Sequence, residues 1–77
     1  MKFKNYYKIL GVKRTSSTNE IKLRFKELAL KYHPDKNPDF NSHLIFNEIL
    51  EAYQTLSDLD KRLKYAESFT KHTKNII

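Results

Sequence analysis

Two stretches of the 77-residue chain repeat apolar residues at helical spacing, and a segment with two prolines separates them. In the first stretch the apolar residues recur at spacings of four, three and four: Ile21, Phe25, Leu28 and Tyr32. In the second the spacings are three, four and three: Phe46, Ile49, Tyr53 and Leu56. Because these spacings place the side chains on one face of an α-helix, both stretches are predicted to be amphipathic helices. Two such helices joined by a short loop form an antiparallel hairpin with facing stripes.

The residues between the stripes end the first helix and stiffen the connection to the second. Pro34 disfavours helical geometry at His33 and offers no N–H donor, so we expect this helix to end at Tyr32 or His33. A second proline follows within five residues, and the Asp and Asn residues between them favour turns. The next helix is predicted to begin at Asn41 or Ser42.

Shorter elements are predicted before the hairpin. Asn5 is a suitable N-cap for about one and a half turns of helix over residues 6–10. Gly11 then supplies the left-handed residue that ends this helix. Ser17 is followed three residues later by Glu20, which fits a capping box at the start of the long helix.

After the second stripe, Asp60 is the predicted cap of a short fourth helix, with Leu63 and either Tyr65 or Ala66 facing inward. Beyond Glu67 the sequence shows no periodicity, so we expect residues 1–67 to form the domain and residues 68–77 to be a frayed tail or the start of a linker. The predicted fold is all-α with four helices: a central antiparallel hairpin of the second and third helices, a short first helix and a short fourth helix. The single Gly and two Pro agree with this, because a fold of many tight turns needs more of both.

The composition excludes several kinds of chemistry. Without Cys there is no disulfide and no thiolate metal site, and the three histidines (His33, His43 and His72) lack metal-ligand spacing. His33 and Asp35 have no Ser or Cys nucleophile to accompany them, and Gly11 stands alone rather than in a phosphate-binding loop. We therefore expect no metal, no cofactor, no small-molecule substrate and no enzymatic activity.

The net charge of +6 is unevenly distributed along the chain. Residues 1–14 have five basic residues and no acid, residues 20–36 and 60–77 are net basic, and residues 37–59 have four acids and no Lys or Arg. A basic surface favours an acidic partner such as nucleic acid, an anionic membrane or an acidic protein face. On charge alone, an ordinary solvated surface is the simpler interpretation. No stretch has the pattern of a signal peptide or the length of a membrane span, so we expect a soluble, cytoplasmic monomer.

One alternative is a small helical nucleic-acid-binding domain in which the basic second helix enters a groove of the duplex. Two residues argue against this alternative. Glu27 interrupts the basic face of the helix, and Asp35 in the following loop would repel phosphate.

Short segments along most of the chain match the pattern of a known family. They are residues 5–12, 20–21, 25–29, 31–37, 46–49, 51–53, 56–58 and 60–62, together with Tyr65. Over about residues 4–66 the chain resembles a J domain, the module of DnaJ-type co-chaperones. The tripeptide His33-Pro34-Asp35 falls in the loop between the two long helices, with the flanking apolar residues in register. This context makes the match far more specific than the tripeptide alone.

The resemblance implies both a role and a site. J domains bind heat shock protein 70 chaperones of the DnaK class and stimulate their ATP hydrolysis. The basic second helix of the family meets an acidic region of the chaperone's ATPase domain, and the His-Pro-Asp loop engages the place where that domain meets its linker and substrate domain. Carried onto this sequence, the partner-binding residues are His33, Pro34 and Asp35, supported by Lys22, Lys26, Lys36 and Asn37.

Three residues depart from the family pattern. Glu27 stands where J domains commonly carry Lys or Arg, Asn47 replaces a frequent basic residue, and Ala66 stands where Asp is common. No segment rich in glycine and phenylalanine, of the kind that follows the domain in DnaJ-like proteins, appears after residue 67. We therefore expect a protein that shares only the J domain with them, or a fragment of a longer protein.

Overall fold

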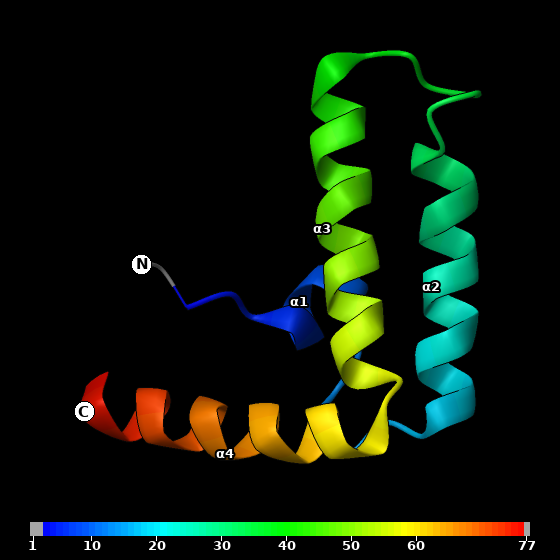
Figure 1. Cartoon of the computed structure of the whole chain (residues 1–77). Helices are drawn as coiled ribbons and strands as arrows, with labels where there is room; N and C mark the ends of the chain where they lie inside the picture. Colours follow the sequence, from blue (N-terminus) through cyan, green and yellow to red (C-terminus); the bar gives the residue numbers. More distant parts are fainter. Residues whose placement is uncertain (1–2, 77) are drawn as a thin grey trace.

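Four helices form the described part of the chain, residues 3–76, in the computed structural model, which describes the side chains of residues 3–71. They are α1 (Tyr6–Leu10), α2 (Thr18–Tyr32), α3 (Phe40–Leu56) and α4 (Leu59–Ile76), and no strand occurs among these residues. Figure 1 shows α2 and α3 side by side and running in opposite directions, with α4 across one end of the pair. The predicted all-α fold with a central helical hairpin is confirmed. α2 ends where the sequence predicts, and α3 begins one residue earlier than predicted. None of the described helices is long and apolar enough to cross a membrane.

The hydrophobic core lies where the four helices meet. Its buried residues are Tyr7, Leu10, Ile21, Ile49, Ala52, Leu56 and Tyr65. The two predicted stripes face each other: the ring of Phe25 in α2 stacks on that of Tyr53 in α3, with centroids 4.0 Å apart. The five-residue α1 is too short to be stable alone, and it is held because Tyr7 and Leu10 are buried in this core.

Side-chain caps define the ends of the first two helices. Asn5 Oδ1 accepts a hydrogen bond from Lys8 N at 3.1 Å, and Gly11 ends α1 with a φ of 70°. Ser17 Oγ accepts from Glu20 N at 3.1 Å at the start of α2. The sequence predicts all three caps, because Asn and Ser accept from the free N–H groups of a helix start and glycine adopts positive φ without strain.

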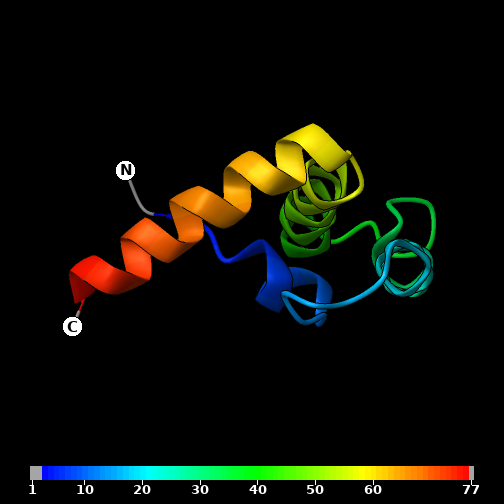
Figure 2. The ribbon, with the colours of Figure 1, turned by 90° about the horizontal axis from the view of Figure 1, so that it is seen from below.

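α4 is longer than the sequence predicts. Its 18 residues continue to Ile76, so the predicted short helix and frayed tail over residues 68–77 are wrong as far as Ile76, beyond which the chain is not described. The physical reason is Phe69, one turn after the buried Tyr65. The Phe69 ring packs edge-on against Tyr7 with centroids 5.2 Å apart, which extends the core past the predicted end of the domain. Figure 2, in which α2 and α3 are seen end-on, shows α4 extending sideways well past the hairpin.

The start of α4 also differs from the prediction. Its cap is Asp58 rather than Asp60, because Asp58 Oδ1 accepts from Lys61 N at 3.1 Å. Tyr65 faces inward as predicted and sets the buried side of α4, whereas the prediction for Leu63 is wrong because that side chain is exposed.

A polar network joins the N-terminal segment to α3 and α4. Tyr6 OH donates to Glu51 Oε2 at 2.5 Å, and Lys4 Nζ lies 3.2 Å from Glu51 Oε1. Tyr65 OH donates to the Lys4 carbonyl at 2.5 Å and accepts from Tyr6 N at 2.9 Å. Burial, followed by the interaction with Glu51, raises the pKa of Tyr6 to about 12. The hydrogen bonds from Tyr6 and then Lys4 hold the pKa of Glu51 below its ordinary value.

Candidate functional site

The loop after α2 folds into a turn closed by two backbone hydrogen bonds. His33 is the C-cap of α2, and its carbonyl accepts from Lys36 N and Asn37 N, both at 2.9 Å. Pro34 lies inside this turn, where its fixed φ limits the available backbone conformations. The loop occupies the end of the hairpin opposite to α4 (Figure 1). The structure therefore brings His33, Pro34 and Asp35 together in a restrained turn.

The His33 ring is held between the loop backbone and α3. Its Nδ1 accepts from Asp35 N at 3.2 Å, and the ring lies edge-on to Phe46 with centroids 5.6 Å apart. An Nδ1 that accepts a hydrogen bond carries no proton, so the neutral ring has its proton on Nε2. Within residues 3–71 no hydrogen bond from Nε2 is found, so this N–H has no internal acceptor there. His33 thus fixes the loop through one nitrogen and offers the other.

Asp35 presents its carboxylate to solvent. The side chain is 89 % exposed, and its Oδ2 lies 3.6 Å from His33 Nδ1. These two groups form an ion pair only when the imidazole is protonated, so beside the neutral ring the carboxylate keeps its acceptor sites. A carboxylate in this state suits two parallel hydrogen bonds from an arginine.

Asn37 closes the loop, a role that the sequence analysis missed. Its Nδ2 donates to the carbonyl of Lys31, in the last turn of α2, where carbonyls lack intrahelical partners. An Asn a few residues after a helix end is the available signal, but the same residue type is common in any turn. We predicted that Asn37 supports partner binding. In the structure its side-chain amide already makes this internal contact.

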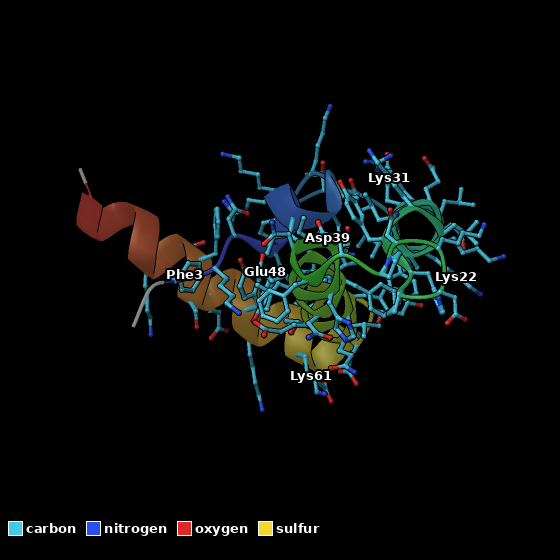
Figure 3. All side chains as sticks on the ribbon, turned by 90° about the horizontal axis from the view of Figure 1, so that it is seen from above. Phe3, Lys22, Lys31, Asp39, Glu48 and Lys61 are labelled. Atoms are coloured by element: carbon cyan, nitrogen blue, oxygen red, sulfur yellow. The ribbon has the colours of Figure 1, made fainter. Side chains whose placement is uncertain are left out.

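The lysines of the predicted site are all exposed. Lys22 and Lys26 are one helical turn apart, and Lys36 lies in the loop itself. Figure 3 shows Lys22 on the side of α2 that faces away from α3. At 1.5 Å per residue, Lys26 and Lys22 lie about 10 Å and about 17 Å from His33 along the helix axis, and at 3.6 residues per turn the two lysines fall on one side of α2. The two lysines therefore form a basic strip that runs along α2 toward the loop.

A family model described as the DnaJ domain matches residues 5–66 of the chain. The chain belongs to the J-domain family. This J domain is 61 % identical over 64 residues to a DnaJ-like protein of Synechocystis, covering 82 % of this chain and 19 % of the relative. It is 52 % identical over 62 residues to human DnaJ homolog subfamily B member 9, covering 80 % of this chain and 28 % of the relative. The chain thus spans less than a third of the length of these relatives.

Solved structures of J domains have the same fold. A J-Trx1 fragment of ERdj5 matches with a TM-score of 0.79 at 50 % identity, covering 84 % of this chain and 32 % of that one. The J domain of human DnaJ subfamily C member 12 matches with a TM-score of 0.82 at 29 % identity, covering 94 % of this chain and 65 % of that one.

Glu27 has a local partner in this J domain. Its Oε2 lies 3.1 Å from Nη1 of Arg24, and Arg24 Nε donates to the Leu10 carbonyl at 3.2 Å. Arg24 is therefore tied to the end of α1 and neutralised by Glu27. The remaining positive charge of α2 consequently rests on Lys22, Lys26 and Lys31, which are exposed and form no ion pair among residues 3–71.

Proposed function

We propose that this J domain binds a heat shock protein 70 chaperone of the DnaK class and stimulates its ATP hydrolysis. The observation that carries the proposal is the Asp35 carboxylate, which is 89 % exposed and follows the restrained turn at the end of α2. Lys22 and Lys26 lie on the same side of α2 and supply positive charge toward an acidic chaperone face. In this proposal the J domain is a monomeric, cytoplasmic binding module and performs no catalysis itself.

Each part of the site has a physical role in docking. Asp35 accepts charge-assisted hydrogen bonds from an arginine of the chaperone. Pro34 and the hydrogen bond between His33 Nδ1 and Asp35 N restrict the loop before binding, so little conformational entropy is lost on docking. Lys22 and Lys26 raise the rate of encounter, and this contribution falls as added salt screens the charges.

Stimulation of hydrolysis is allosteric in this proposal. The J domain binds the hydrolysis-competent arrangement of the chaperone more tightly than the other arrangements, and thereby shifts its population. A tenfold preference for that arrangement corresponds to about 1.4 kcal/mol. No residue of the J domain needs to touch ATP.

The proposal is tested by single-turnover ATP hydrolysis with a purified DnaK-class chaperone. We expect the parent chain to accelerate hydrolysis and Asp35→Asn to remove the acceleration, because the amide cannot accept two parallel hydrogen bonds from an arginine. Asp39→Asn is the matched control, since Asp39 is four residues away, is exposed, and makes no side-chain cap bond to α3. Circular dichroism checks that both variants keep the helicity of the parent.

Equal stimulation by the parent chain and by Asp35→Asn would contradict this mechanism. Salt-sensitive binding to duplex DNA without any effect on the ATPase would instead favour the nucleic-acid-binding alternative.

A further inference from the structure

A groove lies between α4 and the α1–α2 region, at the end of the molecule away from the His-Pro-Asp loop. It has a volume of about 480 Å³ and is lined by Tyr7, Arg14, Thr15, Leu59, Arg62, Leu63 and Ala66. We call it the α4 groove. Figure 1 shows that the length of α3 separates α4 from the loop. A ligand in this groove would therefore leave the loop accessible.

One wall of the α4 groove is an apolar stripe along α4. Leu59 is 72 % exposed and Leu63 is 57 % exposed, although both border the same hollow. With Ala66 they occupy positions i, i+4 and i+7 of the helix, so the stripe runs about 10 Å along one face. Single exposed leucines are ordinary on protein surfaces, but a pair aligned in a hollow is typical of sites that receive an amphipathic helix.

Two arginines border this stripe, and neutral groups hold both in place. Arg62 Nη2 donates to the Arg14 carbonyl at 3.0 Å and to the Ser16 carbonyl at 2.7 Å. Arg14 Nη2 donates to Thr70 Oγ1 at 2.9 Å, and the Arg14 guanidinium lies 5.2 Å from the centroid of the Phe69 ring. Neither arginine forms an ion pair with a carboxylate among residues 3–71. Their positions are therefore fixed while their charges are not neutralised.

The segments that form the groove are basic as a whole. Residues 13–15 and 59–67 contain five basic residues (Lys13, Arg14, Lys61, Arg62 and Lys64) and two acids (Asp60 and Glu67). A partner that fills the groove must therefore combine apolar side chains for the stripe with negative charge for its border. A nucleic acid supplies the charge but lacks side chains suited to the leucine stripe.

We propose that the α4 groove binds an amphipathic helical segment of a partner protein, with leucine-like side chains on one face and carboxylates along its edge. The apolar face covers Leu59 and Leu63, and the carboxylates form hydrogen bonds with Arg14 and Arg62. This surface is separate from the His-Pro-Asp loop, so the proposal does not depend on chaperone binding.

Binding of two synthetic peptides, measured by fluorescence anisotropy with the whole chain, tests the proposal. Both peptides carry leucines at positions i, i+4 and i+7 of a helix, and one has Glu where the other has Gln at the flanking positions. We expect the Glu peptide to bind about tenfold more tightly at low salt, and added salt to remove that difference. We expect Leu63→Ser to weaken binding of the Glu peptide at least about fivefold, because it removes part of the apolar stripe.

Leu44→Ser is the matched control, since Leu44 of α3 is 50 % exposed and does not line the groove. It should leave peptide binding unchanged, and Leu59→Ser should reproduce the effect of Leu63→Ser. Stimulation of a DnaK-class ATPase should be the same for Leu63→Ser and the parent, which separates this test from that of the loop. The proposal is wrong if neither peptide binds, if Leu44→Ser weakens binding as much as Leu63→Ser, or if the chain self-associates through Leu63 in sedimentation experiments.

Discussion

At the residue scale, Arg24 connects two parts of the J domain. Its guanidinium contacts the Leu10 carbonyl at the end of α1 and the carboxylate of Glu27 on α2. Gly11 lies directly under this side chain: a Cβ at that position would lie 2.8 Å from Arg24 Nη2, so any larger residue would displace the end of the guanidinium in addition to straining the backbone at its φ of 70°. The net charge on this part of α2 therefore depends on the pairing of Arg24 with Glu27, and the missing side chain of Gly11 leaves room for the Arg24 guanidinium.

We predict that Glu27→Gln increases the rate of association with a DnaK-class chaperone about two- to fivefold at low salt. The substitution removes a negative charge beside Lys26 and leaves Arg24 without its carboxylate, so the outward side of α2 becomes more positive. Stopped-flow measurements at several salt concentrations test this. Glu48→Gln is the control, because Glu48 lies on the side of α3 away from α2 (Figure 3) and its loss changes the net charge equally. Equal acceleration by both variants would show that only net charge matters.

At the scale of elements, the length of α4 is the property that local sequence patterns did not predict. The stripes of α2 and α3 and the caps at Asn5 and Ser17 are predictable because each depends on residues within a few positions of one another. The length of α4 depends on the contact between Phe69 and Tyr7, which are far apart in the sequence. The loop shows the same distinction. Its residues are identifiable from their sequence pattern, but the contact between the His33 ring and Phe46 of α3 is visible only in the folded structure.

We predict that Phe69→Ala lowers the free energy of unfolding by about 2 kcal/mol, less than for a fully buried phenylalanine because Phe69 is only partly buried. The loss of its contact with Tyr7 should also reduce the helix content of the second half of α4. Thermal unfolding followed by circular dichroism measures both effects. Phe40→Ala is the matched control, since Phe40 is 73 % exposed and should change the stability by less than about 0.5 kcal/mol. A similar loss in both variants would contradict the role assigned to Phe69.

At the scale of the whole molecule, the network around Glu51 adds polar contacts between three segments that also meet in the core: the N-terminal segment, α3 and α4. Tyr6 and Lys4 approach Glu51 of α3 from the N-terminal side, and Tyr65 of α4 forms hydrogen bonds with the backbone of both.

The shifted pKa values of Tyr6 and Glu51 make the contribution of this network to stability depend on pH. The raised pKa of Tyr6 means that its contribution to stability is complete below pH 10.0 and is lost as the pH rises toward about 12. The lowered pKa of Glu51 means that its contribution is present above pH 4.5 and is lost as the pH falls further.

We predict that Tyr6→Phe lowers the free energy of unfolding by about 1 kcal/mol at pH 7, because Glu51 loses a hydrogen bond while the aromatic ring is kept. The variant should also lose less stability than the parent between pH 10.0 and about 12, and again below pH 4.5. Denaturant unfolding across this pH range tests the prediction. Tyr32→Phe is the control, since the Tyr32 hydroxyl makes no side-chain hydrogen bond within residues 3–71 and its removal should change the free energy of unfolding at pH 7 by less than about 0.5 kcal/mol. Parallel profiles for Tyr6→Phe and the parent would contradict the assignment.

The chain enters and leaves the fold beside α4, because Phe3 stacks on Tyr65 with ring centroids 5.4 Å apart and α4 is the last helix. α3 leads from that end to the loop (Figure 1), and at 1.5 Å per residue its 17 residues span about 25 Å. α3 thus separates the His-Pro-Asp loop from the segments that begin and end the described chain. A surface, a label or another domain joined at either end stands off from the loop by about that length.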